Sequence, residues 1–223
     1  MDIAIHTSRV NKYFGTGNGR VHALKNVSLD IGAGTLTILK GRSGSGKTTL
    51  LNVLSALDMP DDGIVEFLGE DIHSFSERKK EKLRRYQMGF VFQSIALIPV
   101  MTAFENVDFA LRLAGYEEDR KKRVNEVLGR VGLSKRMEHM VNQLSGGEQQ
   151  RVAIARAVAH KPKVVFADEP TGALDTASGL AVMQLFRELV EAEGITIVMT
   201  THDPNLMELG DAVYEIADGR LVK

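Results

Sequence analysis

The sequence predicts an α/β fold with a mainly parallel sheet, because stretches of strand character alternate with helical stretches along its second half. Residues 164–167, Val-Val-Phe-Ala, form the near-continuous apolar run of a strand buried in a parallel sheet. A second β-rich run, residues 195–200, follows a helical pattern over residues 177–193. Residues from about 102 to 160 have mostly helical patterns, which predicts a helical lobe inserted between two strands of the sheet.

The first third of the chain is typical of strands and turns. Residues 21–31 alternate apolar and polar side chains, which is the period of a half-buried strand. A glycine turn separates them from a short β-rich run at residues 35–39. A glycine-rich loop at residues 41–46 comes next, and a helical pattern then extends from Lys47 to about Leu57.

Further along, the chain contains two more predicted strands and a charged helix. The β-branched content of residues 64–68 predicts a strand, and the highly charged residues 75–86 are expected to be helical. Residues 89–92 are expected to form a short buried strand. The tail, residues 212–222, is predicted to be a hairpin that turns at Asp218-Gly219.

Length and composition are those of one ordinary globular domain over residues 1–223. The net charge of −1 argues against nucleic-acid binding through bulk electrostatics. The chain has no cysteine, which excludes disulfides and thiolate metal sites. Its start lacks signal-peptide features, and no window reaches the roughly 18 apolar residues of a membrane span. We therefore expect a cytoplasmic protein that reaches a membrane only through another chain.

Residues 41–48, Gly-Arg-Ser-Gly-Ser-Gly-Lys-Thr, fit the pattern G-x-x-x-x-G-K-[ST]. The glycines let successive N–H groups converge on an anion, and the following helix start adds partial positive charge. Lys47 supplies a full charge for the β- and γ-phosphates, and the Thr48 hydroxyl can ligate Mg²⁺. A flexible glycine turn is the alternative, but chance produces such a match in only about one chain per hundred of this length. The expected phosphate-binding residues are Gly41, Ser43, Gly44, Ser45, Gly46, Lys47, Thr48 and Thr49.

Two adjacent carboxylates, Asp168 and Glu169, follow the buried strand 164–167. Ligands of open α/β sheets bind outside the carboxyl ends of the strands. Adjacent side chains of an extended chain point in opposite directions, so the two acids are expected to have different roles. Asp168 is the expected Mg²⁺ partner, through water, and Glu169 the expected general base toward the attacking water. Alone, such a pair is usually a solvated strand end; after a phosphate-binding loop, the catalytic interpretation is favoured.

Residues 144–151, Leu-Ser-Gly-Gly-Glu-Gln-Gln-Arg, lead into an alanine-rich helical stretch at residues 152–157. Ser145 is a suitable N-cap, and Gly146 and Gly147 leave the helix start open to close approach. Because glycine weakens a helix start, an ordinary capped helix does not account for both glycines. The segment is therefore a predicted second anion-binding site.

This octapeptide resembles the signature of ATP-binding cassette (ABC) ATPases, and other motifs of that family occur in the family's order over nearly the whole chain. The resemblance implies a P-loop NTPase fold with an N-terminal antiparallel β lobe and an inserted helical lobe. Residues 1–92 and 157–223 are the expected ATP-binding core with the β lobe. Residues 93–156 are the expected helical lobe, which carries the signature.

The resemblance also implies roles for single residues. Gln93 corresponds to the family's metal- and water-sensing glutamine, and His202 to its switch histidine for the γ-phosphate. Asp175 closes a loop, residues 172–175, that serves communication between subunits. Phe14 matches by register the aromatic residue that stacks on adenine, and the adjacent Tyr13 is the alternative. With ATP and Mg²⁺ as ligands, the implied catalytic set is Lys47, Gln93, Glu169 and His202, and the implied metal set is Thr48, Gln93 and Asp168.

For assembly, the resemblance implies a head-to-tail dimer with two ATP molecules between the subunits. The helix start at Ser145–Gly147 of one subunit would cap the γ-phosphate that the Lys47 loop of the other subunit holds. A homodimer is expected because the chain carries every motif; a heterodimer with a related subunit is the alternative.

Two surface segments suggest contacts outside the dimer. The apolar segment Ser94–Met101 is the expected docking site of a transmembrane permease, and packing within the helical lobe is the alternative. The basic cluster at residues 78–85 is expected to be a solvated helix face, with acidic lipid headgroups as the alternative contact.

Residues 168–175 and 92–107 resemble the group of lipoprotein-release, macrolide-export, antimicrobial-peptide-resistance and cell-division cassettes. We therefore expect the ATPase subunit of an exporter or mechanotransmission system, peripheral on the inner face of the cell membrane. Two alternatives remain open: an ATP-dependent regulator of an extracytoplasmic enzyme, and a soluble ABC ATPase outside transport. The single uninterrupted cassette disfavours the second.

Overall fold

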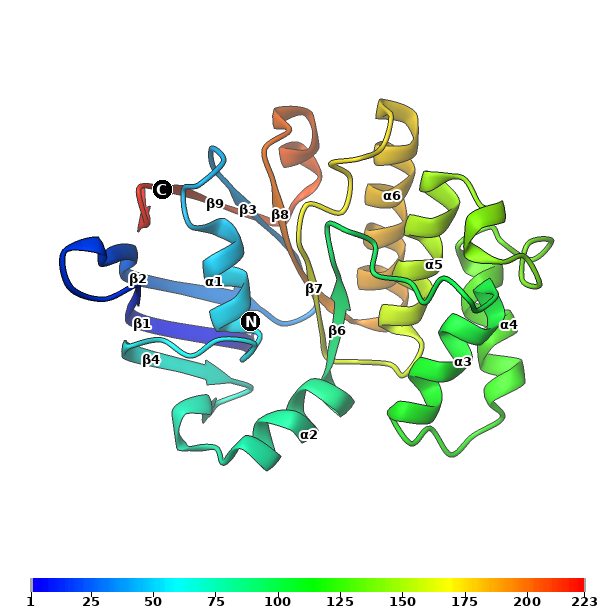
Figure 1. Cartoon of the computed structure of the whole chain (residues 1–223), viewed down its shortest axis with the longest axis horizontal. Helices are drawn as coiled ribbons and strands as arrows, with labels where there is room; N and C mark the ends of the chain where they lie inside the picture. Colours follow the sequence, from blue (N-terminus) through cyan, green and yellow to red (C-terminus); the bar gives the residue numbers. More distant parts are fainter. Residues whose placement is uncertain (1, 223) are drawn as a thin grey trace.

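Two β-sheets with helices packed around them make up the computed structural model, which describes residues 2–222 (Figure 1). Within those residues, a six-stranded sheet has the order β10-β9-β3-β8-β7-β6, and all of its strands except β10 run parallel. A four-stranded antiparallel sheet has the order β2-β1-β4-β5. The strands are β1 (Ile3–Phe14), β2 (Val21–Gly32), β3 (Leu36–Lys40), β4 (Asp62–Phe67), β5 (Glu70–Asp71), β6 (Met88–Val91), β7 (Val164–Ala167), β8 (Thr196–Thr201), β9 (Ala212–Ala217) and β10 (Arg220–Leu221).

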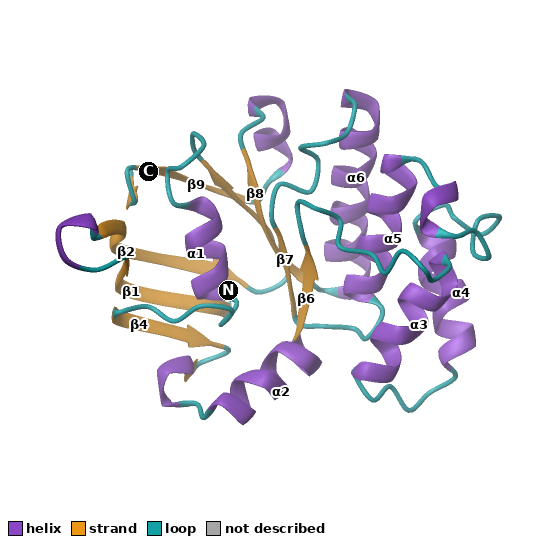
Figure 2. Ribbon diagram, in the orientation of Figure 1, coloured by secondary structure: helices purple, strands orange, loops and turns teal. Residues whose placement is uncertain are grey.

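The helices divide between the two ends of the molecule. Helices α3, α4 and α5 lie between β6 and β7 in the chain and gather at the end opposite the antiparallel sheet (Figure 2). No helix within residues 2–222 has both the length and the apolar character that crossing a bilayer requires. The helices are α1 (Lys47–Leu54), α2 (Glu77–Gln87), α3 (Ala103–Leu113), α4 (Arg120–Arg130), α5 (Gly146–Val158) and α6 (Thr176–Glu193).

The predicted α/β fold, with its antiparallel lobe and inserted helical lobe, is confirmed. Most element boundaries agree with the sequence patterns within two residues. One helix is shorter than predicted: α1 ends at Leu54, with Ser55 as its C-cap, and not near Leu57. Ala56 has a left-handed backbone with φ of 53°, which a right-handed helix does not tolerate.

Strand β1 was not predicted as a single element, and a β-bulge explains why. Arg9 has φ of 48°, and the register with β2 shifts between Thr7 and Val10. Such a bulge interrupts the alternation of buried and exposed side chains from which a strand is recognised.

The parallel sheet is buried on both faces. Alternate residues of one strand therefore belong to two hydrophobic cores: Val165 and Ala167 of β7 pack with the helical lobe, and Val164 and Phe166 pack toward the antiparallel sheet. Because both faces are covered, ligands reach the sheet at the ends of its strands.

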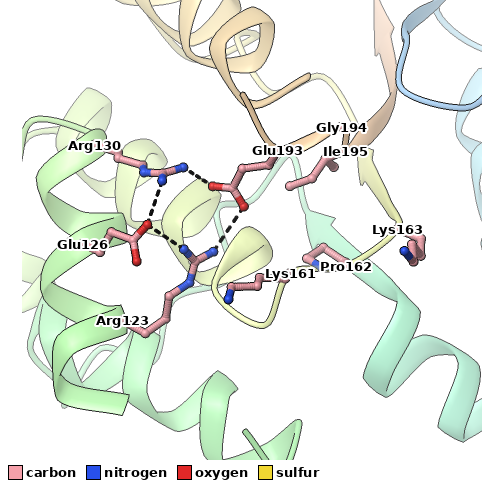
Figure 3. A pocket seen from close by; sticks show the side chains of 9 residues that line it. All are labelled: Arg123, Glu126, Arg130, Lys161, Pro162, Lys163, Glu193, Gly194 and Ile195. Carbon is pink, nitrogen blue, oxygen red and sulfur yellow. Dashed lines mark hydrogen bonds and ion pairs between the residues drawn. The ribbon is translucent and has the colours of Figure 1, made fainter. Parts of the chain in front are cut away.

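An ion-pair network joins the helical lobe to the rest of the chain. Arg123 of α4 is only 3% exposed, and its guanidinium donates to the carbonyl oxygens of Ala159 at 2.8 Å and Val158 at 3.2 Å. Its Nη2 lies 3.4 Å from the carboxylate of Glu193, at the end of α6. Arg130 forms an ion pair with the same carboxylate. Figure 3 shows both guanidinium groups pointing at Glu193 beside a cavity of about 450 Å³. The network fixes α4 against the ends of α5 and α6.

Candidate active site

The phosphate-binding loop connects the end of β3 to the start of α1 and needs its glycines for steric reasons. A Cβ on Gly41 would lie 2.3 Å from the carbonyl oxygen of Ile216. A Cβ on Gly46, the N-cap of α1 with φ of 107°, would lie 2.9 Å from the carbonyl oxygen of Ala23. Lys47 is buried, and its Nζ donates to the carbonyl oxygen of Gly41 at 2.9 Å. The loop thus curls around the lysine ammonium.

The hairpin β9–β10 supports this loop from behind. The N–H of Gly219 donates to the carbonyl oxygen of Ser45 at 2.9 Å, and the carbonyl oxygen of Gly219 accepts from the N–H of Lys25 at 2.7 Å. The turn has left-handed residues at both Asp218 and Gly219, with φ of 48° and 77°. The predicted hairpin is therefore confirmed, and it ties the C-terminal strands to β2 and to the phosphate loop.

The carboxyl end of β7 meets the phosphate loop through hydroxyl groups. Asp168 accepts hydrogen bonds from Thr48 Oγ1 at 3.0 Å and from Thr200 Oγ1 at 2.6 Å. The same Thr200 hydroxyl accepts from the N–H of Glu169 at 2.8 Å. Thr200, at the end of β8, therefore holds both acids in place. The sequence interpretation did not include this residue; its position at the carboxyl edge of a parallel strand was the available signal.

Glu169 turns away from Asp168 toward two cationic or ionisable side chains. Its Oε1 lies 3.8 Å from Lys47 Nζ, and its Oε2 lies 3.4 Å from His202 Nδ1. Its backbone has φ of 42°, a conformation that non-glycine residues adopt rarely and often at functional sites. A Cβ on Gly172 would lie 3.3 Å from Glu169 Oε2, so a glycine there leaves room for the carboxylate.

Lys47, Thr48, Glu169 and His202 line one cavity of about 990 Å³, whereas Asp168 and Thr200 are not among its lining residues. Phe14 lines it and is 45% exposed, whereas Tyr13 stacks on His22 with a centroid distance of 4.1 Å and lies under the Arg20 guanidinium. The predicted site residues that line the cavity are Phe14, Ser43, Gly44, Gly46, Lys47, Thr48, Thr49, Gln93, Glu169 and His202. Other lining residues, to which the sequence interpretation assigned no role in the site, are Val21, His22, Ala23, Lys25, Arg42, Asp218 and Gly219.

The signature segment is not among the residues that line this cavity. Ser145 is the N-cap of α5 and forms a reciprocal capping box with Glu148. The N–H of Ser145 donates to Glu148, and this bond leads the causes that lower the pKa of that carboxyl. A Cβ on Gly146 would meet no atom within 4 Å, so the helix start is open on that side. Within one chain, then, the two predicted anion sites are separate.

Asp175 lies at the N-terminus of α6 and lines a neighbouring cavity of about 380 Å³ together with Glu169 and His202. It accepts hydrogen bonds from the N–H and the hydroxyl of Ser178, and the first of these contributes most to lowering the pKa of Asp175. The loop from Glu169 to Asp175 thus connects the acid at the end of β7 with a capped helix start.

An apolar groove of about 640 Å³ lies between α2, α3, β6 and the end of α5. From the segment Ser94–Met101, Ala96 and Ile98 line this groove, whereas Leu97 packs against the core of the helical lobe. The packing interpretation therefore holds for Leu97, and docking of a permease at Ala96 and Ile98 stays a prediction. Its other apolar lining residues are Leu57, Met88, Phe90, Phe92, Phe109, Ala110, Leu113, Ala114 and Ala157.

The basic cluster on α2 borders the groove and is only partly a solvated face. Lys80 is 7% exposed and pairs with Glu77 at 2.8 Å, and Arg84 Nη1 donates to the carbonyl oxygen of Ala56 at 2.7 Å. Arg78 and Lys82 are exposed. The cluster thus combines internal contacts with surface charge.

A glycine-rich loop between β3 and α1, whose Lys47 and Thr48 line one cavity with Glu169 while Asp168 binds the Thr48 hydroxyl, is the arrangement of a P-loop ATPase. A sequence model of the family described as "ABC transporter" matches residues 24–172. The ABC transporter ATP-binding protein MJ0796 of Methanocaldococcus jannaschii is 43% identical over 222 residues, which cover 97% of this chain and 94% of the relative. This chain belongs to the ABC transporter family, as one of its ATP-hydrolysing, ATP-binding subunits.

Comparison with solved structures also places this chain among the ATP-binding cassettes. A dimeric structure of the ATP-binding cassette MJ0796, described as a post-hydrolysis state bound to ADP and Pi, has a TM-score of 0.90. It is 40% identical and covers 98% of this chain and 97% of that one. The macrolide export ATP-binding/permease protein MacB of Nitrosomonas europaea is 45% identical over 212 residues, which are 95% of this chain but 32% of MacB.

Proposed function

We propose that two copies of this chain close around two ATP molecules, and that the cycle of closing and opening drives a separate transmembrane permease. The observation that carries the proposal is the division of the site. Lys47, Glu169 and His202 converge on one cavity, while the helix start at Ser145–Gly147 lies outside it and is open to approach.

ATP fits the cavity by the chemistry of its two ends. The loop N–H groups and Lys47 suit the triphosphate. Phe14, half-exposed at the cavity wall, suits the adenine ring, and the engagement of Tyr13 with His22 and Arg20 favours Phe14 over Tyr13. Gly41 and Ser45 belong to the same loop, so they complete the phosphate-binding set.

The donor set also fits Mg²⁺. Thr48 and Asp168 place oxygen atoms within 3.1 Å of each other beside the phosphate loop, and hard oxygen ligands are those that Mg²⁺ prefers. Thr48 and Gln93 would hold the ion, with Asp168 acting through water. When bound, Mg²⁺ would neutralise charge on the phosphates.

The hydrolysis step follows from Glu169 and its neighbours. The carboxylate accepts a proton from a water molecule, whose oxygen then bonds to the γ-phosphorus while the bond to the β–γ bridging oxygen breaks. ADP and inorganic phosphate leave. Lys47 would balance the charge on the phosphates. The 3.4 Å separation of His202 Nδ1 from Glu169 Oε2 supports a role for His202 at the γ-phosphate.

The proposed dimer supplies what one chain lacks. A second copy would bring its Ser145–Gly147 helix start, with its free N–H groups, to the γ-phosphate. The dimeric structures of MJ0796 support a homodimer. Asp175, which lines a cavity together with Glu169 and His202, would take part in communication between the subunits. Loss of the γ-phosphate removes the bridge, and the dimer opens.

Glu169→Gln tests the dimer. This variant keeps the size of the side chain but cannot take the proton, so ATP stays bound. We expect gel filtration to show a dimer with ATP and a monomer with ADP. Adding Lys47→Ala to the same chain should abolish the dimer, because the triphosphate then loses its main positive charge. A monomer under both nucleotides in the Glu169→Gln chain contradicts the proposal.

The permease is proposed from the groove and from a relative. MacB is described as an ATP-binding/permease protein, and the apolar groove between α2, α3 and β6 suits an amphipathic helix of a membrane partner. This arrangement would place the chain in the cytoplasm, peripheral on the inner face of the membrane, in an exporter or mechanotransmission system. The same contact also suits an ATP-dependent regulator of an extracytoplasmic enzyme, which differs in its partner and not in this chain.

A further inference from the structure

Two residues after Gln93, the backbone adopts a conformation that its side chains disfavour. Ile95 and Ala96 both have left-handed backbones, with φ of 62° and 49°. For a β-branched residue such as isoleucine this conformation is a genuine outlier, and it persists only where surrounding contacts hold it. Local bonds alone are few: the N–H of Ile95 donates to the carbonyl oxygen of Phe92, and that of Ala96 to the carbonyl oxygen of Ser94.

The additional contact comes from α5, the helix that begins with the signature segment. Nη1 of Arg156 donates to the carbonyl oxygen of Ala96 at 2.6 Å, and Nη2 donates to that of Ile95 at 3.5 Å. One guanidinium therefore binds both carbonyl groups of the left-handed pair. The rigid fork of arginine suits two adjacent acceptors in a way that the single ammonium of lysine does not.

Within the part of the chain that the structure describes, Arg156 is held by hydrogen bonds and by no ion pair. Among residues 2–222, no carboxylate lies within ion-pair distance of its guanidinium. Burial lowers the pKa of Arg156 from its ordinary value, although an arginine stays protonated in proteins. The groove also contains the Glu81 carboxylate, but it forms no ion pair with Arg156, so the hydrogen bonds to Ile95 and Ala96 are the polar contacts that hold this cation in mostly apolar surroundings.

The position of Arg156 connects three parts of the molecule. It lies on the helix that starts at Ser145, it lines the apolar groove, and it holds the loop that follows Gln93. Gln93 itself lines the nucleotide cavity.

We propose that Arg156 is a positioning residue. It fixes the loop that follows Gln93, residues 94–101, to α5, the helix that begins at the signature segment, so that the loop and the helix move together. The inference rests on the proposed role of Gln93 at the nucleotide, and it adds Arg156 as the side chain that connects the loop after Gln93 to α5. A partner bound in the groove would cover Arg156 and would therefore affect both the loop after Gln93 and α5.

The experiment uses the absence of cysteine from the chain. Val100, 78% exposed in the same loop, is replaced by cysteine and spin-labelled, and this labelled chain is compared with versions that also carry Arg156→Gln or Arg156→Lys. Arg120→Gln, at an exposed ion pair on α4, is the matched control. The label's mobility, the thermal midpoint, kcat and KM for ATP are measured for each chain.

We expect Arg156→Gln to raise the mobility of the label and to lower kcat by about tenfold or more, with KM for ATP changed by less than about twofold. Arg156→Lys should lie between, since it keeps the charge but loses the fork. If Arg156→Gln lowers the thermal midpoint too far to be assayed, Arg156→Lys decides by the same criteria. Unchanged label mobility overturns the proposal.

A Gln93→Ala chain separates this proposal from the one on which it rests. If Gln93→Ala lowers kcat while Arg156→Gln loosens the loop and leaves kcat unchanged, the link through Arg156 is wrong. If Gln93→Ala itself leaves kcat unchanged, the proposed role of Gln93 fails, and the label alone then confirms or overturns the fixing of the loop by Arg156.

Discussion

At the scale of single residues, steric need explains more of this site than charge does. Gly41 and Gly46 are required because backbone carbonyl groups of other strands approach them. The motif at residues 41–48 already assigned both glycines to the phosphate loop. Gly219 meets the same need from the other end of the chain, where the carbonyl oxygen of Ala23 would lie 2.4 Å from a Cβ. The sequence indicated a turn at Gly219 but gave no sign of its contact with the phosphate loop.

Gly219→Ala tests this support. The substitution combines a left-handed backbone with a clash against a carbonyl group, so we expect a loss of about 2–3 kcal/mol in the free energy of unfolding, or roughly 5–10 °C in the thermal midpoint. Gly69→Ala is the matched control: its φ is 81°, but a Cβ there has open space, so the cost should be about 1 kcal/mol. Equal losses in the two variants contradict the account.

At the scale of elements, the sequence predicted what depends on local pattern and missed what depends on distant contacts. Helix α5 followed from the cap at Ser145 and the alanine-rich stretch, and β7 followed from its apolar run. Strand β1 was hidden by the bulge at Arg9, and the role of Thr200 was missed because its partners Asp168 and Glu169, which lie 32 and 31 residues away in the sequence, contact it only in the folded chain. Such contacts between distant residues cannot be predicted from their spacing in the sequence.

The end of α5 gives a prediction of pH dependence. His160 donates from Nε2 to the carbonyl oxygen of Met88, at 3.0 Å, and burial lowers the pKa of this histidine. The unfolded chain therefore binds the proton more readily than the folded chain. Stability should fall as the pH drops through about 6.5, the ordinary histidine value, and rise as the pH increases.

His160→Gln keeps a donor for Met88 and removes the titration. Urea midpoints measured at about pH 7.5 and about pH 5.5 should differ less in this variant than in the unmodified chain. His73→Gln, at an exposed histidine, should keep the full difference. A pH difference that is the same in all three chains contradicts the assignment to His160.

At the scale of the whole molecule, the end of β6 connects the two hollows: Gln93 lines the nucleotide cavity, and Ala96 and Ile98 of the segment that follows it line the apolar groove. The sequence predicted the segment Ser94–Met101 as a docking site from its apolar character. It did not identify the groove, because most of the lining residues come from α2, α3 and β6 and meet only in the fold.

Leu113→Asp tests the groove. Leu113 is 53% exposed within it, so a charge there should abolish co-purification of a permease from detergent-solubilised membranes while basal ATPase activity stays within about twofold. Leu97→Asp is unsuitable because Leu97 is partly buried against the core of the helical lobe, so a charge there would also disturb the packing. Ile64→Asp, at an apolar residue of β4 that is 45% exposed, should leave co-purification intact. Retention of the permease by the Leu113→Asp chain contradicts the docking site.

The central claim is that the phosphate loop of one copy and the signature helix of another meet on the same ATP. Two chains test it, both carrying Glu169→Gln: one has Arg42→Cys in the phosphate loop, and the other has Gly146→Cys, where a side chain has open space, and a tag that changes its size. Mixed with a short bifunctional thiol reagent, they should form a cross-link between the two copies that requires ATP. Absence of this product with ATP present, or an equal yield without ATP, contradicts the account.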